Sequence, residues 1–306
     1  MKKPFYLITT IILSVCVLCA CSGKGTTATI TEPTGAEPTV TPQPTEPPAT
    51  PTPTPSPLPT LTTAPTPTPT PEPIKELSEF DPKEFFADVV CCGDSLLHLY
   101  RFRGGPTNRQ EIFGDRYTSD WLTITNYCIR LAVKDVKTLY PGDAACVPKY
   151  RGERVNLWDA IPLCGKKRVM MFFGLNDIGV TGVDKFVTDY QAVIEHIRET
   201  SPDVKFYILS ITPMRKDKQD GMLDNKKIRN ANEKLKAMCE ENGWTYVDVA
   251  SDLTDENGNL ILTRNGKSLS DGSNVHLTNA GYVYWDNVLE QLAREELRKE
   301  YYEGRK

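Results

Sequence analysis

Short apolar runs alternate with longer amphipathic stretches between residues 88 and 299. An apolar run of five to seven residues is typical of a strand buried on both faces, whereas apolar residues at every third or fourth position are typical of a helix. The runs are Asp88–Cys92, Arg168–Phe173, Lys205–Ile211 and Trp244–Val249, and the helical stretches are Val183–Glu199, Asn225–Asn242 and Asn279–Lys299. This alternation predicts an α/β fold, a three-layer α/β/α sandwich with a parallel sheet. Ligands of such sheets bind at the carboxyl ends of the strands, so we expect the functional site there.

The amino terminus has the composition of an export signal. Lys2 and Lys3 precede an apolar run, Phe5 to Leu18, that is too short to span a bilayer comfortably. The run ends at Cys19-Ala20-Cys21, which resembles the cleavage site of bacterial lipoproteins. We therefore expect residues 1–20 to be a signal peptide and Cys21 to carry lipid, which predicts attachment to the outer face of a bacterial membrane. The alternative is an ordinary signal peptide with incidental cysteines.

The segment from residue 21 to residue 74 is dominated by Thr and Pro and has few large apolar residues. Such a segment cannot bury enough surface to offset the entropy of folding, so we expect a disordered, extended stalk. The remaining part, residues 75–306, has the size of one domain. The whole chain carries a net charge of −4, and no basic patch stands out, so a nucleic-acid partner is not expected.

Six cysteines fall in the predicted domain. An even number in an exported protein permits disulfides, but a domain of this size can form its own core without them. Their spacing matches no zinc site, and we expect neither a metal nor an organic cofactor. The adjacent pair Cys91-Cys92 is interpreted as lining the two faces of a buried strand. The six are Cys91, Cys92, Cys128, Cys146, Cys164 and Cys239.

The segment Gly93-Asp94-Ser95-Leu96-Leu97 directly follows the first predicted strand. A serine at the end of a strand, entering a helix, has an exposed hydroxyl, and backbone N–H groups beside it can stabilise an oxyanion. The same segment could equally be a simple turn that caps a helix. A serine nucleophile also requires a base within hydrogen-bond reach.

The chain contains three histidines that could supply this base. His98 falls one helical turn after Ser95 and should point away from the strand ends. His196 lies within a predicted amphipathic helix and is interpreted as a surface or boundary residue. His276 lies in a polar loop before the last helix, with Asp271 nearby and Thr278 as the expected helix cap. This position suits a catalytic base, so we favour His276.

Three segments together resemble the SGNH/GDSL hydrolase family, over nearly all of residues 86–292. They are Gly93-Asp94-Ser95-Leu96, Gly174-Leu175-Asn176-Asp177 and Asp271–His276. The resemblance implies a flavodoxin-like fold with Ser95 as nucleophile, His276 as base and the Asn176 side chain as oxyanion donor. Asp94 and Asp177 are interpreted as bracing their turns through backbone N–H groups.

The chain departs from this family at two positions. The orienting aspartate usually stands three residues before the histidine, where this chain has Ser273, so Asp271 must reach His276 across a bulged loop. Otherwise a backbone carbonyl holds the imidazole and the triad is a dyad. The glycine that supplies a second oxyanion N–H has no clear counterpart, and Asn126 is the preferred candidate, with Gly142 as a lesser one.

The resemblance implies a serine esterase that acts through an acyl-enzyme on a small or polymeric ester. The anchor and the stalk favour deacetylation of an extracellular carbohydrate. Transfer of an acetyl group to a sugar, or a non-catalytic surface binding module on the same scaffold, are the alternatives.

Overall fold

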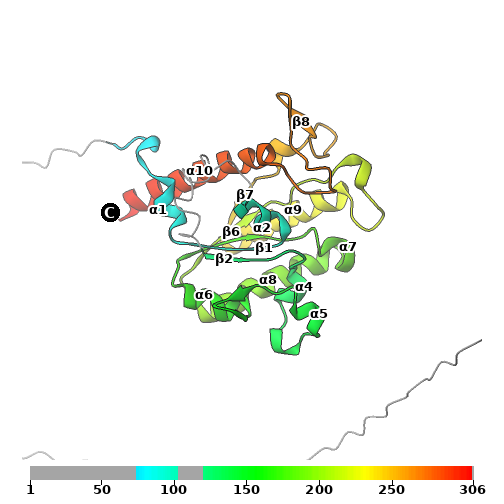
Figure 1. Ribbon diagram of the computed structural model, residues 1–306. Coiled ribbons are helices and arrows are strands. Elements are labelled where there is room, and N and C mark those ends of the chain that lie inside the picture. The colour runs from blue at the N-terminus through cyan, green and yellow to red at the C-terminus, as the bar shows by residue number, and fades with distance from the viewer. Residues whose placement is uncertain (1–73, 103–119, 305–306) are drawn as a thin grey trace, which may run out of the picture. The chain divides into compact units, whose positions relative to one another are not determined.

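The computed structural model describes residues 74–102 and 120–304. The predicted signal peptide and lipidated Cys21 lie outside the described residues, as does the stalk apart from Ile74. In the described part, five parallel strands form the central sheet in the order β2-β1-β5-β6-β7 (Figure 1). The strands are β1 (Val89–Gly93), β2 (Asp120–Thr123), β5 (Arg168–Phe172), β6 (Lys205–Leu209) and β7 (Thr245–Val247). This is the flavodoxin-like order, as the resemblance implied.

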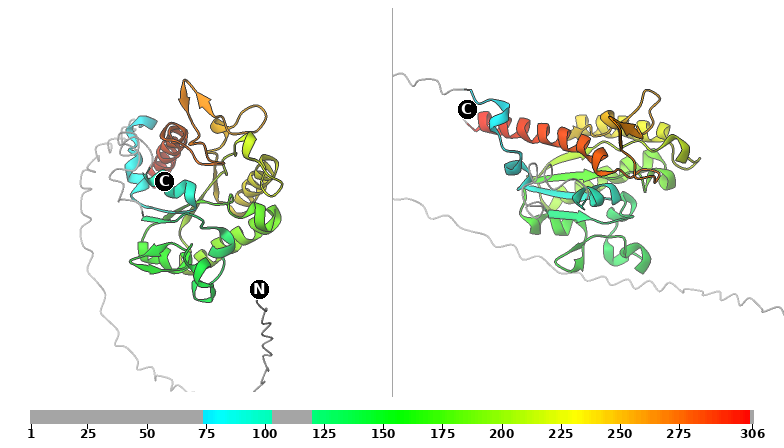
Figure 2. Two further views of the ribbon diagram at one scale, coloured as in Figure 1. Left: turned by 45° about the vertical axis from the view of Figure 1, so that its right-hand side comes forward. Right: turned by 45° about the horizontal axis from the view of Figure 1, so that its top comes forward.

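Helices cover both faces of the sheet, as predicted. The main ones are α1 (Pro82–Phe86), α2 (Ser95–Phe102), α4 (Ile129–Ala132), α6 (Leu157–Cys164), α8 (Val183–Thr200), α9 (Asn225–Asn242) and α10 (Asn279–Glu303). Helices α1, α2 and α10 pack on one face, and α1 lies alongside α10 (Figures 1 and 2). Helices α4, α6, α8 and α9 pack on the other. The result is the expected three-layer sandwich.

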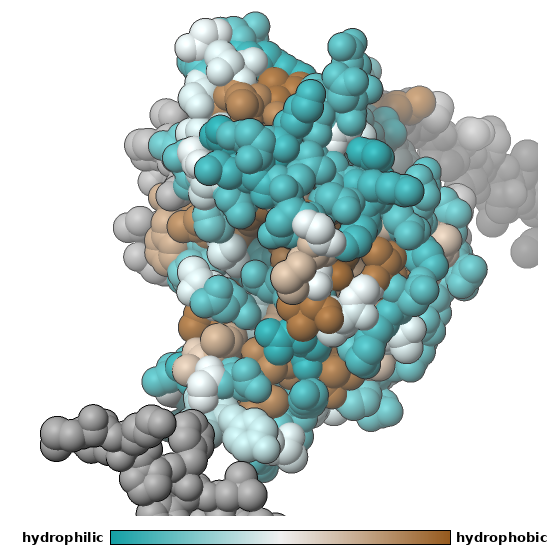
Figure 3. Space-filling model, turned by 90° about the vertical axis from the view of Figure 1, so that its right-hand side faces the viewer, coloured by the Kyte–Doolittle hydropathy of each residue, from teal (hydrophilic) through white to brown (hydrophobic). Residues whose placement is uncertain are grey.

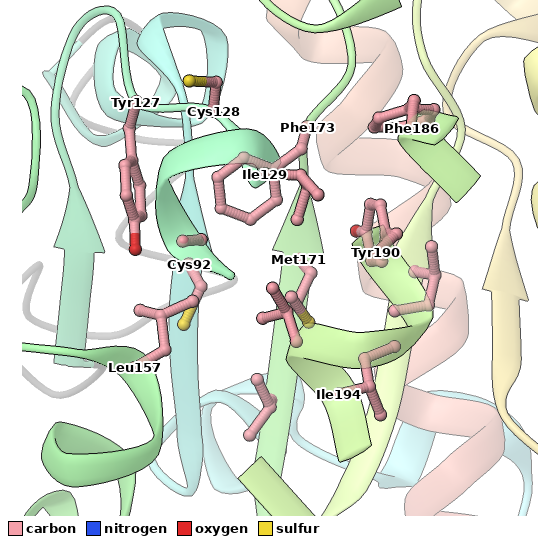
Figure 4. Close-up of a cluster of buried hydrophobic side chains, with 14 of the residues drawn as sticks. Cys92, Tyr127, Cys128, Ile129, Leu157, Met171, Phe173, Phe186, Tyr190 and Ile194 are labelled. Atoms are coloured by element: carbon pink, nitrogen blue, oxygen red, sulfur yellow. The ribbon is translucent and has the colours of Figure 1, made fainter. Parts of the chain in front are cut away.

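Successive side chains of the apolar strands point alternately into the cores on the two faces of the sheet. Cys92 and Met171 face the core beneath α8 together with Tyr127 and Phe173 (Figure 4), whereas Cys91 belongs to the opposite core. Both adjacent cysteines are fully buried, which confirms that they line the two faces of one strand. All six cysteines of the described residues are free thiols.

Shorter elements complete the described part of the chain. They are the helices α5 (Pro141–Ala144) and α7 (Ile178–Thr181), the 3-10 turns η1 (Leu77–Glu79), η2 (Val136–Thr138), η3 (Lys216–Lys218) and η4 (Ser251–Leu253), and the hairpins β3 (Lys149–Tyr150) with β4 (Glu153–Arg154) and β8 (Thr263–Arg264) with β9 (Lys267–Ser268). No helix among the described residues is both long enough and apolar enough to cross a membrane.

Candidate active site

Ser95 is the first residue of α2 and directly follows the turn that ends β1. Two contacts fix this turn: the Asp94 N–H donates to the Phe172 carbonyl at 3.2 Å, and Asp94 Oδ1 accepts from the Leu96 N–H at 2.9 Å. A side chain at Gly93 would place its Cβ 2.7 Å from the Phe172 carbonyl oxygen, so only glycine fits between β1 and β5. The position of Ser95 is thus fixed by the two central strands.

His276 contacts Ser95 directly. Its Nε2 lies 2.9 Å from Ser95 Oγ, and both residues are partly buried. The loop that carries His276 is closed by a bridge between Ser270 and Leu277, and Thr278 then caps α10 by accepting from the Gly281 N–H at 3.2 Å. The structure therefore brings together the predicted nucleophile and the predicted base.

Asp271 and Ser273 lie in the same loop but make different contacts. The Asp271 N–H donates to the His276 carbonyl at 3.2 Å, and Asp271 Oδ1 accepts from the Ser273 N–H at 3.0 Å. Ser273, which stands where the family usually has its aspartate, accepts from the His276 N–H through its Oγ at 3.1 Å. These bonds fix the His276 backbone, and the role of Asp271 toward the imidazole stays a prediction.

The two predicted oxyanion donors come from neighbouring segments. Asn176 follows β5, and its Nδ2 donates to the Tyr127 carbonyl at 3.1 Å. Because an amide nitrogen carries two hydrogens, this bond orients the group and leaves one N–H for a ligand. Asn126 immediately precedes Tyr127 and has a φ of 64°, the left-handed conformation that glycine adopts most easily and asparagine tolerates. Asn126 thus occupies a backbone position suited to the glycine that the sequence lacks.

Asp94 and Asp177 are buried and lie beside this site. Asp94 braces its own turn, as predicted. Asp177 instead accepts from the N–H groups of Ile129 and Arg130, at 3.1 and 3.0 Å, so it ties the turn after β5 to the first turn of α4. Burial raises the pKa of Asp94 to about 8 and that of Asp177 to about 6. Both carboxyl groups hold backbone segments in place by accepting hydrogen bonds from N–H groups.

The other two histidines have separate surroundings. Nδ1 of His98 lies 3.1 Å from both the carbonyl oxygen and the hydroxyl of Thr123 on β2, and burial lowers the pKa of this imidazole. His196 is half-buried and packs edge-on against Trp158 on α6. Neither residue lines the pocket around Ser95, whereas His276 does.

A pocket of about 370 Å³ surrounds Ser95 at the carboxyl ends of the strands. Figure 3 views the side of the molecule on which α7 lies, where apolar surface forms several small patches between polar side chains. Four lining residues lie outside the three motifs and were not predicted: Thr125, Met214, Asp220 and Leu223. The described lining residues are Ser95, Thr125, Asn126, Leu175, Asn176, Met214, Asp220, Leu223, Ser273, Asn274, Val275 and His276.

The site offers no group of metal ligands. Among the described residues, no three His, Cys, Asp or Glu side chains are grouped so that they could hold a metal ion. The chemistry available to the described residues is instead a hydroxyl beside an imidazole, with amide N–H groups from Asn176 and from the start of α2 nearby.

Solved structures of low identity resemble this chain. A GDSL-like lipase from Bacteroides thetaiotaomicron is 15% identical, and the match, with a TM-score of 0.48, covers 70% of this chain and 90% of the lipase. The periplasmic domain of a lipopolysaccharide acetyltransferase from Salmonella ser. Paratyphi A is 16% identical, with coverages of 66% and 82% and a TM-score of 0.48. The acetyl xylan esterase AlAXEase is 16% identical, with coverages of 65% and 96% and a TM-score of 0.45. Likenesses at this level do not bear on the substrate.

No curated protein matches the chain. A sequence model of the GDSL-like lipase/acylhydrolase family, in contrast, matches residues 91–284, which include Ser95, Asn176 and His276. The chain therefore belongs to the GDSL-like lipase/acylhydrolase family.

Proposed function

We propose that this protein is a serine esterase that removes acetyl groups from an extracellular carbohydrate. The observation that carries the proposal is the 2.9 Å contact between Ser95 Oγ and His276 Nε2 inside a pocket that also contains the Asn176 amide. A nucleophile, a base within hydrogen-bond reach and an oxyanion donor are the groups that acyl transfer requires.

The proposed reaction has two halves. In the first, His276 Nε2 takes the proton of Ser95 while Oγ attacks the ester carbonyl, and the imidazolium then protonates the departing alcohol. In the second, water loses a proton to His276 and attacks the acyl-enzyme, which releases the acid and restores the Ser95 hydroxyl. Asp271 is proposed to orient the imidazole.

The oxyanion of each tetrahedral intermediate needs hydrogen-bond donors. The second N–H of Asn176 Nδ2 is one, since its first is held by Tyr127. The first N–H groups of a helix have no carbonyl partner within the helix, so Ser95 can supply another from the start of α2. The backbone N–H of Asn126 is proposed as the third.

The character of the pocket supports a short acyl group and a polar alcohol. A pocket of about 370 Å³ is at the small end of ligand sites and leaves little room for a fatty chain. Thr125, Asn126, Ser273 and Asn274 place polar side chains around the serine. A hydroxylated sugar can hydrogen-bond to these polar side chains, and the apolar lining residues suit the methyl of an acetyl group.

The experiment that tests the serine mechanism uses the full chain, its Ser95→Ala variant and a fluorophosphonate probe. Wild type should become labelled and should hydrolyse 4-nitrophenyl acetate, and Ser95→Ala should do neither. Ser201→Ala, which alters a serine at the carboxyl end of α8, is the control and should behave as wild type. If the wild-type chain is neither labelled nor active, the protein is better explained as a binding module. If it acetylates an added sugar instead of releasing acetate, it is a transferase.

The location is a separate part of the proposal. Lipidation of Cys21 would place the enzyme on the outer face of the cell membrane, with the Thr/Pro-rich segment as a spacer. Metabolic labelling with a fatty acid should mark the wild-type protein in cells, and Cys21→Ala should abolish the label and release the protein into the medium. Equal labelling of both would exclude Cys21 as the anchor.

A further inference from the structure

Asp220 is the one acidic side chain among the described residues that line the Ser95 pocket. No lysine or arginine is among these residues, and His276 carries charge only after it has taken a proton. The remaining lining side chains are neutral. Among the described residues, a ligand in this pocket therefore meets one negative charge with no opposite charge across from it.

The loop around Asp220 holds this carboxylate in place. Oδ1 accepts from the N–H groups of Met222 and Leu223 at 2.9 and 2.8 Å, and the Asp220 N–H donates to the Leu223 carbonyl at 3.1 Å. Within the described part of the chain, no hydrogen bond joins Oδ2 to another residue. One oxygen thus anchors the loop, and the other can accept a hydrogen bond from a ligand.

Lys227, in the first turn of α9, contacts this loop without pairing with the carboxylate. Lys227 Nζ donates to the carbonyls of Gly221 and Met222, at 2.8 Å each, and makes no ion pair with Asp220. Lys227 also does not line the pocket. Among the described residues Asp220 therefore has no ion-pair partner. Its carboxylate is exposed, so water weakens its effect on a ligand in the pocket without removing it.

We propose that Asp220 selects the alcohol part of the ester. Its Oδ2 accepts a hydrogen bond from a free hydroxyl beside the acetylated position of a neutral sugar. Its charge disfavours esters whose alcohol part is negatively charged. This inference rests on the proposed function and narrows its substrate class to neutral, hydroxyl-bearing acetates. Asp220 takes no part in proton transfer at Ser95.

The test compares wild type with Asp220→Asn on two pairs of acetates. Asparagine keeps the oxygen that anchors the loop but removes the charge and presents an N–H in place of an acceptor. The first pair is methyl 4-acetoxybenzoate and 4-acetoxybenzoate, which differ by one negative charge. The second is a mono-O-acetylated methyl xyloside and 4-nitrophenyl acetate, which has no hydroxyl.

The expected results are changes in ratios of kcat/KM. Asp220→Asn should reduce the preference for the neutral over the anionic benzoate by about five- to tenfold. It should lower kcat/KM on the acetylated xyloside by about tenfold relative to kcat/KM on 4-nitrophenyl acetate, because only the xyloside loses a charged hydrogen-bond acceptor. Differences in leaving group cancel because both proteins meet the same substrates.

Asp217→Asn is the matched control, because Asp217 is an exposed carboxylate near Asp220 in sequence, paired with Arg215 and outside the pocket. It should leave both ratios unchanged. Unchanged ratios in Asp220→Asn, with 4-nitrophenyl acetate still hydrolysed, overturn the role of Asp220 alone. An equal loss on every ester would assign Asp220 only to holding the loop. A wild type that hydrolyses no ester overturns the proposed function and this inference with it.

Discussion

Ser95 Oγ and His276 Nε2 lie 2.9 Å apart although 181 residues separate them in the chain. Ser95 is placed by the end of β1, and His276 by the loop that leads into α10. Each belongs to a segment fixed by its own backbone hydrogen bonds, so the contact follows from the fold of these two segments.

His276→Gln should remove most of the turnover, because glutamine cannot take the proton of Ser95. In a serine hydrolase, loss of the base lowers kcat by about 10⁴- to 10⁶-fold. Steady-state hydrolysis of 4-nitrophenyl acetate measures this. His196→Gln, at the half-buried histidine on α8, should stay within about twofold of wild type. Equal activity of both variants would show that His276 is not the base.

Asn176→Ala should lower kcat by about 10²- to 10³-fold and change KM little, because an oxyanion donor acts mainly in the transition state. Asn242 offers a matched control, since its Nδ2 also donates to a backbone carbonyl, that of Met238 at 2.8 Å. Asn242→Ala should leave the kinetics unchanged. A rise in KM with constant kcat for Asn176→Ala would assign Asn176 to substrate binding instead.

Asp271→Asn tests whether the loop carboxylate orients His276. Asparagine can still accept from the Ser273 N–H, so the loop bonds should survive the change. If Asp271 orients the ring, we expect kcat to fall by about 10²- to 10⁴-fold with KM little changed, because the imidazolium would lose its charged partner. The exposed Asp203→Asn serves as control. Wild-type turnover in Asp271→Asn would favour a dyad in which a backbone carbonyl holds the ring.

The sequence predicts the central strands because β1, β5 and β6 are buried on both faces and read as uninterrupted apolar runs. It does not predict β2, because Asp120-Trp121-Leu122-Thr123 is a short, partly exposed edge strand without that pattern. The predicted strand Trp244–Val249 shortens to Thr245–Val247 for the same reason: β7 is the other edge. Edge strands carry weaker hydrophobic signals than central ones.

The site also contains residues that the sequence predicts and residues that it does not. Ser95, Asn176 and His276 stand in short motifs at strand ends or before a helix cap, so their roles could be predicted and their proximity followed from the topology. Asn126 could be predicted only from its separation from Ser95 along the sequence. Its distinguishing property is a left-handed φ, which no residue type encodes by itself. Asp220 reaches the pocket through the loop between β6 and α9, whose path no local pattern encodes.

Gly93→Ala should destabilise the fold at the junction that positions Ser95. The new Cβ would lie 2.7 Å from the Phe172 carbonyl oxygen and 2.9 Å from a methyl carbon of Leu97. We expect the free energy of unfolding to fall by about 1–3 kcal/mol, as for other overpacked cores, and activity to fall with it. Urea unfolding measures the first. Gly142→Ala is the matched control, because nothing lies within 4 Å of its added Cβ in α5, and it should be neutral or stabilising.

Asp94 should make stability depend on pH. Burial raises its pKa in the folded protein to about 8, well above that of an unfolded aspartate near 4. As pH rises from about 4 to 8, the unfolded chain loses this proton while the folded protein retains it, so the free energy of unfolding falls, and above pH 8 this contribution is constant. Asp177, whose pKa is raised to about 6, adds a fall of the same sign between pH 4 and 6.

Asp94→Asn should remove the larger part of this dependence. Asparagine keeps an oxygen for the Leu96 N–H and has no proton to lose. Relative to wild type, the variant should therefore gain stability as the pH rises from 4 to 8, by more than about 1 kcal/mol, since each unit of pKa shift corresponds to about 1.4 kcal/mol. Urea unfolding at pH 4, 6 and 8 measures the difference, and the exposed Asp203→Asn should show none. A constant difference between Asp94→Asn and wild type over this range would mean that the folded protein holds Asp94 with an ordinary pKa.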